Sequence, residues 1–282
     1  MFDLFFLKHF FSSKNKKKKL LQIKHANVLA EKIKARLPEC PDRVPVIIIC
    51  YNNIRYVSNI VQFLNKRKFT PIIIDNASTN IHTLKILNEM GSSGKAIIIK
   101  STYNFGHMVG FRPEIYPLWP EHFAYTDPDL ELNPILPDNF IEILISLTEE
   151  FKVFKAGFAL TLDPPGQIGN LVTHKIGRTP FPFTKSYSIR EWEEQFWSQQ
   201  VKHDALEIYG APIDTTFAVY NKSQYRFNFV SAVRVAGSFS AVHLPWFPAL
   251  DIMSHQERDA YFTNNVSASW LPDREKQGKP NP

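Results

Sequence analysis

Residues 44–51 have the sequence V-P-V-I-I-I-C-Y, a continuous apolar run dominated by β-branched side chains. A short run without polar alternation predicts a strand that is buried on both faces. Similar runs follow at P-I-I-I-D (71–75), A-I-I-I-K (96–100) and F-A-Y-T (123–126), with helical spacing between them at 54–68 and 79–90. Strands that alternate with helices form right-handed βαβ units. We therefore predict an α/β fold with a mostly parallel sheet flanked by helices.

Polar side chains follow three of these predicted strands directly. The clusters are Tyr51-Asn52-Asn53, Asp75-Asn76-Ala77-Ser78 and Thr126-Asp127-Pro128-Asp129. Because ligands of such sheets bind beyond the carboxyl ends of the strands, we expect the three clusters to open onto one crevice.

The last cluster contains two carboxylates one residue apart, Asp127 and Asp129. Hard oxygen ligands in this arrangement suit Mg²⁺ or Mn²⁺, and such an ion can bridge to a substrate diphosphate. The alternative is an ordinary acidic turn, because Asp-x-Asp also occurs by chance. The position after three earlier apolar runs favours the metal site.

Several protein classes are disfavoured. No G-x-G-x-x-G turn follows the first strand and no G-x-x-x-x-G-K-[ST] is present, which argues against a dinucleotide-binding dehydrogenase and a P-loop nucleotide hydrolase. Cys40 and Cys50 are the only cysteines, so we predict neither a disulfide framework nor a thiolate zinc site. The 23 Phe residues predict a Phe-rich core, with a carbohydrate-handling or lipid-contacting surface as the alternative.

The net charge of +6 is concentrated at the N-terminus. Residues 1–36 hold ten Lys or Arg against Asp3 and Glu31, a balance of +8, so the remainder of the chain carries about −2. Seven Phe and Leu side chains within residues 1–11 precede the lysine run 16–19. This apolar part is too short to span a bilayer, but aromatic residues beside lysines suit an arm that lies on an anionic membrane surface. Nucleic-acid binding and a solvated arm are the alternatives; without an Arg-rich or aromatic-interleaved motif, we predict no nucleic-acid partner.

The second half has a different pattern. We expect a helix over 139–151 capped by Asp138, strands over 157–162, 213–220 and 232–242, a long loop over 166–188, an amphipathic helix over 190–201 and a frayed tail over 272–282. Residues 20–37, with helical spacing, should form the first helix. We therefore divide the chain into four parts: a basic and aromatic arm with its helix (1–40), a nucleotide-sugar-binding half (44–150), a half that binds the acceptor and completes the metal site (151–271), and the tail (272–282).

With these pieces placed, residues 44–150 resemble the GT-A class of nucleotide-sugar glycosyltransferases, near its family 2 group. The resemblance is carried by V-P-V-I-I-I-C-Y-N, I-I-I-D-N-A-S-T, N-F-G-H-M-V-G (104–110) and Y-T-D-P-D-L-E-L, in that order. The second half resembles bacterial surface-polysaccharide and lipopolysaccharide transferases through W-E-E-Q-F-W (192–197), A-P-I-D-T-T-F-A-V-Y (211–220), R-V-A-G (234–237) and H-L-P-W (243–246).

The resemblance implies roles on the donor side. Asp75 would accept hydrogen bonds from the base or ribose, with an Asx turn as the alternative. Tyr51 would stack on the base or lie in the core, and Asn53 belongs to the same nucleotide-binding cluster. Asn104 and Gly106, with Gly110, would let the backbone approach the donor, or form a plain loop.

The resemblance also implies a metal site. Asp129 would be the main metal ligand, and Asp127 would contact the ribose or the metal. His243 would complete the coordination shell, with a packed histidine beside Trp246 as the alternative. The cation would be Mn²⁺ or Mg²⁺.

Transfer to a hydroxyl group usually requires a base, unless the enzyme retains configuration. Asp214 is the first candidate because it interrupts an otherwise apolar segment, and Glu193 and Asp163 follow. For Asp214 the alternative is a structural carboxylate held by threonine hydroxyls.

We predict a metal-dependent glycosyltransferase that moves a sugar from a UDP or GDP sugar to a glycan or lipid-linked glycan. We expect it on the cytoplasmic face of a membrane, in lipopolysaccharide or surface-polysaccharide synthesis. A sugar nucleotidyltransferase and a non-catalytic glycan- or membrane-binding module are the alternatives. A sugar nucleotidyltransferase usually has a Gly-rich, basic loop after the first strand, and Tyr51-Asn52-Asn53 does not match it. The intact D-P-D argues against a non-catalytic module.

Overall fold

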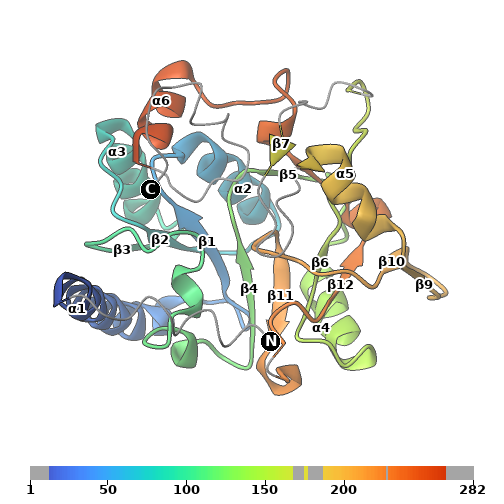
Figure 1. The fold of residues 1–282 in the computed structure, drawn as a ribbon, viewed down its shortest axis with the longest axis horizontal. Coiled ribbons are helices and arrows are strands. Elements are labelled where there is room, and N and C mark those ends of the chain that lie inside the picture. Colours follow the sequence, from blue (N-terminus) through green and yellow to red (C-terminus); the bar gives the residue numbers. More distant parts are fainter. Residues whose placement is uncertain (1–12, 168–174, 177–186, 227, 265–282) are drawn as a thin grey trace.

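The computed structural model describes residues 13–167, 175–176, 187–226 and 228–264 (Figure 1). Its helices are α1 (Ser13–Arg36), α2 (Ile54–Lys66), α3 (Ile81–Ser92), α4 (Phe140–Glu150), α5 (Ile189–Glu194) and α6 (His255–Asn264). Its longer strands are β1 (Val46–Cys50), β2 (Ile72–Asp75), β3 (Ile97–Lys100), β4 (His122–Thr126), β5 (Leu130–Leu132), β6 (Lys155–Phe158), β11 (Ala218–Asn221), β12 (Ala232–Val235) and β13 (Ala241–His243). The two-residue strands are β7 (Lys175–Ile176), β8 (Tyr187–Ser188), β9 (Gln200–Val201) and β10 (Ile208–Tyr209).

One nine-stranded sheet organises the molecule, in the order β3-β2-β1-β4-β11-β6-β12-β10-β9. The strands from β3 to β4 are parallel, as the alternating pattern predicts. β11 then lies antiparallel to both β4 and β6, while β12 is parallel to β6. The α/β prediction is confirmed, and the arrangement is consistent with the GT-A class.

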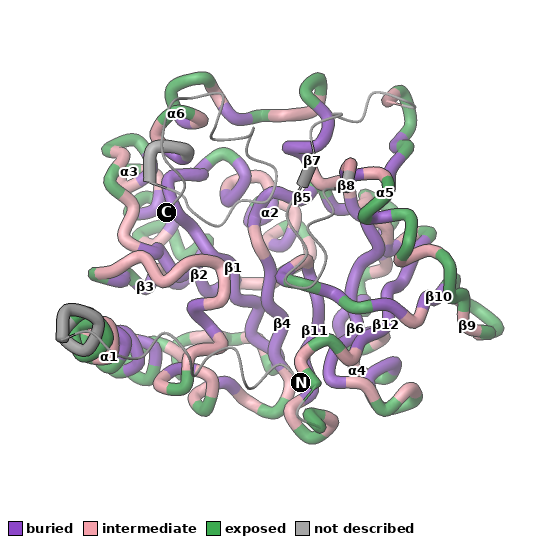
Figure 2. Tube along the Cα trace, in the orientation of Figure 1, coloured by how far each residue is buried: buried purple, intermediate pink, exposed green. Residues whose placement is uncertain are grey.

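The continuous apolar strands are buried because both faces of the sheet are covered. In β1, Val46, Ile48 and Cys50 belong to the core beneath α2, α3 and α4, whereas Ile47 and Ile49 belong to the core shared with α1. Figure 2 shows the buried positions concentrated along the central strands. Phenylalanines contribute many of the large, fully buried side chains, which confirms the Phe-rich core.

The predicted helix over 20–37 is present but begins earlier, because α1 starts at Ser13 and includes the lysine run 16–19. It packs on the sheet through Ala26, Leu29, Ala30 and Ile33, and Lys32 donates a hydrogen bond to the Lys100 carbonyl oxygen at the end of β3 (2.8 Å). Its outer side leaves Leu20, Leu21 and Val28 exposed. Within the described residues, none of the helices has the length and apolarity needed to cross a bilayer. The aromatic segment 1–11 lies outside the described residues, as does the predicted tail.

Three elements of the second half differ from the predictions. The predicted helix over 190–201 is wrong in extent: α5 ends at Glu194 and a 3-10 turn (Gln195–Trp197) leads into β9. The predicted strand over 232–242 is divided into β12 and β13, because the chain turns at Gly237, where φ is +63°. The predicted strand over 213–220 forms only from Ala218 onward.

Smaller differences occur elsewhere. Asp138 does not cap α4; Asn139 precedes the helix without a side-chain cap, and the Asp138 carboxylate lies 3.6 Å from Arg67 Nε. The predicted strand over 157–162 begins two residues earlier, as β6. In the predicted long loop, β7 and β8 pair with each other, and 168–174 and 177–186 lie outside the described residues.

Candidate functional site

The acidic motif lies at the carboxyl end of β4 and leads directly into β5. β5 pairs antiparallel with β13, and this pairing places His243 opposite Leu130, next to Asp129. The Leu244 amide donates a hydrogen bond to the Asp129 carbonyl oxygen (3.0 Å), and His243 Nε2 lies 3.3 Å from Asp129 Oδ2. Two segments far apart in the sequence are thereby joined at one point.

Asp129 and His243 are both withdrawn from solvent but incompletely paired. Asp129 is 8% exposed, and its Oδ1 atom is buried without a hydrogen-bond partner in the described structure. His243 Nδ1 is also buried without a hydrogen-bond partner in the described structure. The His243 ring packs on Trp246 with ring centres 4.5 Å apart. The packing predicted as the alternative for His243 therefore coexists with the contact to Asp129. A buried carboxylate oxygen without a protein partner can accept a hydrogen bond or coordinate a cation.

Asp127 is held by Thr215, from the segment before β11, and by the adjacent Thr126, whose hydroxyl donates to the Asp127 carbonyl oxygen (2.6 Å). The Asp127 amide donates to the Thr215 carbonyl oxygen (2.9 Å), and Thr215 Oγ1 donates to Asp127 Oδ2. Burial raises the pKa of Asp127 well above its usual range, and the nearby charges of Asp129 and then Asp214 raise it further, while the Thr215 hydrogen bond opposes them. A cation beside the pair would favour the ionised form of both carboxylates.

Asp127, Asp129 and His243 supply only part of the coordination shell that a divalent cation requires. Among the described residues, no group of three or more His, Cys, Asp and Glu side chains is placed to hold a metal ion. Asp129 and His243 contact each other, whereas the Asp127 carboxylate faces Thr215. Mg²⁺ is commonly bound by one or two carboxylates together with substrate phosphates rather than by an all-protein cage. The donor set fits that mode, with the unpaired Asp129 Oδ1 as the available ligand.

The three candidate bases have different surroundings. Asp214 is exposed, and it is close enough to Asp127 for its charge to raise the pKa of that carboxyl group. Glu193, on α5, is 2% exposed and forms an ion pair with Arg234, so its carboxylate already has a partner. Burial raises the pKa of Glu193, and the charges of Arg234 and His243 oppose this. Asp163 pairs with Arg190 at the surface (2.8 Å), so its carboxylate also has an arginine partner.

The polar cluster after β1 is connected to the cluster after β2. Asn52, which adopts a φ of +52°, accepts hydrogen bonds from the Thr79 and Asn80 amides through its side-chain oxygen (both 2.9 Å). Tyr51 is 8% exposed, and its amide donates to Asn53 Oδ1 (3.0 Å). These hydrogen bonds join the two loops into one rim at the carboxyl ends of β1 and β2.

Asp75 forms the turn that was predicted as its alternative role. Its Oδ1 atom accepts the Ser78 amide (2.9 Å), and the residue is 2% exposed. This contact organises the loop and occupies one carboxylate oxygen.

The loop over 104–110 is anchored to the rim by Asn76. The Asn76 side chain donates to Asn104 Oδ1 and to the Gly106 carbonyl oxygen (both 2.9 Å). Gly106 has a φ of +77° and open space where a Cβ would lie, while its amide donates to Asn104 Oδ1 (2.9 Å). Gly110 differs, because a Cβ there would lie 2.3 Å from the Tyr125 ring. Gly110 therefore serves packing, and Gly106 is the position compatible with close approach of a ligand.

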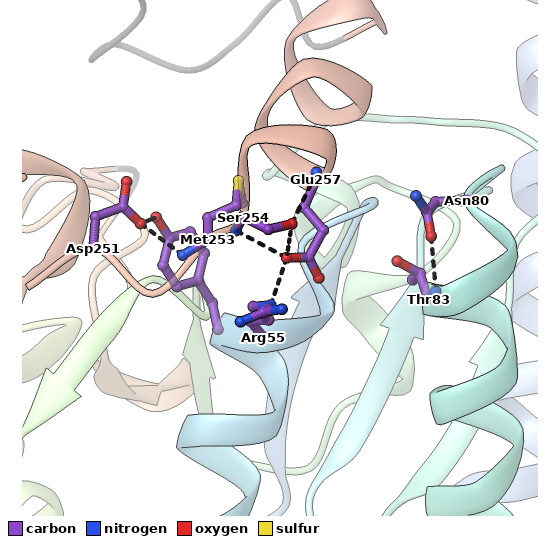
Figure 3. A network of polar contacts seen from close by, with 8 residues as sticks. Arg55, Asn80, Thr83, Asp251, Met253, Ser254 and Glu257 are labelled. Atoms are coloured by element: carbon purple, nitrogen blue, oxygen red, sulfur yellow. Dashed lines mark hydrogen bonds and ion pairs between the residues drawn. The ribbon is translucent and has the colours of Figure 1, made fainter.

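Helix α6 is linked to α2 by polar contacts, and Figure 3 shows Glu257 of α6 facing Arg55 of α2. Glu257 is 3% exposed, accepts the Ser254 amide (3.0 Å) and pairs with Arg55 on α2 (2.6 Å). Tyr56 donates its hydroxyl to Asp251 (2.6 Å). Burial raises the pKa of Tyr56, and the largest charge contribution comes from Asp129, so this contact lies beside the acidic motif.

Sequence reasoning missed Thr215, Lys155 and Arg234. The two cations had a usable signal, because each interrupts an apolar strand in the same way that singled out Asp214. Thr215 had none, since its contact with Asp127 depends on the antiparallel placement of β11 beside β4.

Comparison with known proteins does not assign this chain to a family. No family model matches the chain, and no curated protein matches it. Among solved structures, TarS 1–349 of S. aureus is 15% identical with a TM-score of 0.32, over 55% of this chain and 49% of that one. This chain thus spans about half the length of that protein. The mannosyltransferase PcManGT from Pyrobaculum calidifontis, in complex with GDP-Man and Mn²⁺, is 13% identical with a TM-score of 0.42, over 80% of this chain and 67% of that one. Because both TM-scores are below 0.5, neither similarity identifies a family for this chain. The fold class is assigned from the strand order and strand directions of the sheet.

Proposed function

We propose that this protein is a metal-dependent glycosyltransferase that moves a sugar from a nucleoside diphosphate sugar, with UDP or GDP as the nucleotide, to a glycan acceptor. The observation that carries the proposal is the pairing of β5 with β13. It brings His243 within 3.3 Å of Asp129 and leaves Asp129 Oδ1 buried and unpaired among the described residues.

The donor would lie along the rim formed by the carboxyl ends of β1, β2 and β4. Gly106 leaves open space at its Cβ position beside this rim, where the donor would approach. Asp129, His243 and Asp127 would hold Mn²⁺ or Mg²⁺ with the diphosphate. The cation would offset charge on the leaving diphosphate. Asp214, exposed and near Asp127, is the carboxylate best placed to accept the acceptor hydroxyl proton, because Glu193 and Asp163 are paired with arginines.

The test is a pair of measurements on the purified full chain. A thermal-shift panel of UDP, GDP and CMP with and without Mn²⁺ should show stabilisation by one nucleotide that depends on Mn²⁺. Release of nucleotide from the matching sugar donor should then fall at least about 100-fold in Asp129→Asn, since loss of the metal contact removes several kcal/mol of charge stabilisation.

Asp138→Asn is the matched control, because the Asp138 side chain is 93% exposed and lies outside the site. Its turnover should equal that of wild type. Equal turnover in wild type and Asp129→Asn would contradict the proposal and favour a non-catalytic binding module. Incorporation of a nucleotide into an activated sugar would favour a nucleotidyltransferase.

We extend the proposal to a lipid-linked acceptor in lipopolysaccharide or surface-polysaccharide synthesis, on the cytoplasmic face of the membrane. Lys18, Lys19 and Lys24 lie on α1 with the exposed Leu20 and Leu21. Each basic residue near an anionic surface contributes roughly 1 kcal/mol of binding.

Deletion of residues 1–19 tests this extension. The shortened protein should no longer sediment with phosphatidylglycerol-containing vesicles, while its turnover on a soluble acceptor should be retained. Unchanged sedimentation would refute the membrane assignment and leave the activity proposal in place.

A further inference from the structure

Thr215 contacts Asp127 twice, through its main chain and through its side chain. Its carbonyl oxygen accepts the Asp127 amide (2.9 Å), and its hydroxyl donates to Asp127 Oδ2. Thr215 is 3% exposed, so solvent does not compete for these hydrogen bonds. Both the backbone and the carboxylate of Asp127 are therefore oriented by one residue of another segment.

The segment that carries Thr215 is itself held by two buried cations. Arg234 Nε donates to the Pro212 carbonyl oxygen (2.8 Å), and Lys155 Nζ lies 3.4 Å from the Asp214 carbonyl oxygen. Arg234 is 5% exposed and Lys155 is 0% exposed. The Tyr220 hydroxyl is a second donor to the Asp214 carbonyl oxygen (3.3 Å).

Burying two cations is costly unless each is well paired. Arg234 is compensated by Glu193, whereas Lys155 has the Asp214 carbonyl oxygen and the face of Phe229, 3.9 Å from its Nζ. The shared result of these contacts is a fixed backbone over 212–214. Thr215, the next residue, therefore presents its hydroxyl from a rigid support.

We propose that Thr215 is a positioning residue for the donor site: it fixes the Asp127 carboxylate so that the acidic pair can bind a divalent cation together with a nucleoside diphosphate. This inference rests on the proposed function. Without the hydroxyl, Asp127 Oδ2 loses its donor, and the carboxylate can rotate away from the cation.

The test compares Thr215→Val, which keeps the shape but loses the hydroxyl, with Thr215→Ser, which keeps the hydroxyl. Mn²⁺ binding in the presence of UDP or GDP is measured by electron paramagnetic resonance, which needs no acceptor and no turnover. We expect Thr215→Val to weaken binding by about 10- to 100-fold and Thr215→Ser to stay within about threefold of wild type. Thr216→Val, a substitution of the partly exposed neighbour, should leave binding unchanged.

Three results would overturn the inference. Thr215→Val with wild-type affinity would show that the hydroxyl does not position the carboxylate. Equal weakening in Thr215→Ser and Thr215→Val would assign the effect to packing. A wild-type chain that binds no Mn²⁺ with either nucleotide would refute the proposed function and this inference with it. This outcome is separate from the other two, because it is seen in the wild-type protein before any variant is compared. Circular dichroism of each variant confirms that the comparison is between folded proteins.

Discussion

Replacement of Lys155 by Met should change how the stability of the protein depends on pH. Lys155 is fully buried in β6, and burial lowers its pKa to about 7, with the Asp214 charge opposing the shift and the Arg234 charge adding to it. In the unfolded chain the same group has its ordinary pKa of 10.5. Met has a similar length and no charge, so it removes the titration while keeping most of the packing.

The sign and the magnitude follow from proton linkage. Between the two pKa values the unfolded chain binds more protons than the folded protein, so the free energy of unfolding rises with pH. Below pH 7 the lysine is charged in both states, and its destabilising contribution is complete. It disappears as the pH approaches the unfolded value. Each unit of pKa shift is worth about 1.4 kcal/mol, so the whole window amounts to on the order of 5 kcal/mol.

The assay is urea denaturation of wild type and Lys155→Met at several pH values from about 6 to about 10. We expect the stability of wild type, relative to Lys155→Met, to increase steadily over this range. Lys85→Met, at a side chain that is 73% exposed, is the control and should follow wild type. Parallel curves for wild type and Lys155→Met would refute the assignment of a buried, easily deprotonated lysine.

Three further outcomes are expected. Gly110→Ala should cost about 1–3 kcal/mol of stability, because its Cβ would overlap the Tyr125 ring at 2.3 Å, and thermal denaturation measures this; an unchanged melting temperature would show that the ring can move aside. Arg234→Met should cost about 3–5 kcal/mol by leaving Glu193 buried without its cation, with the double variant that also carries Glu193→Gln recovering part of the loss in urea denaturation. Glu257→Ala removes the acceptor of the Ser254 amide at the start of α6 and should destabilise the helix by about 1 kcal/mol, seen as faster hydrogen exchange of its amides; equal exchange in both proteins would show that this hydrogen bond does not hold the helix end.

The first half of the fold was predictable because its signals are local. The runs at 46–50, 72–75 and 97–100 are apolar on every position or nearly so, and only a strand covered on both faces buries such a run. In the second half the strands are short and their partners are distant. Residues 232–242 look like one strand, yet the turn at Gly237 sends the two parts into different sheets.

In the candidate site, too, local features were predictable from the sequence and distant contacts were not. The acidic pair was visible in the sequence because it follows an apolar run, and the link between Asp129 and His243 was implied by a resemblance rather than by any local pattern. The Thr215 hydroxyl could not be assigned, because only the insertion of β11 beside β4 brings it to Asp127. The predicted roles of Glu193 and Asp163 as bases depended on charge alone, and charge does not reveal that each has an arginine partner.

The position of β11 has a consequence for biosynthesis. This strand is among the later parts of the chain, yet it lies between β4 and β6, near the middle of the nine strands. During synthesis, at about 5–20 residues per second, a nascent chain that ends before residue 218 exposes the edge of β4, whose unpaired amides and carbonyls can recruit another chain. We therefore expect fragments truncated near residue 150 to aggregate, and a ribosome-bound chain to require a chaperone until Ala218–Asn221 of β11 has emerged.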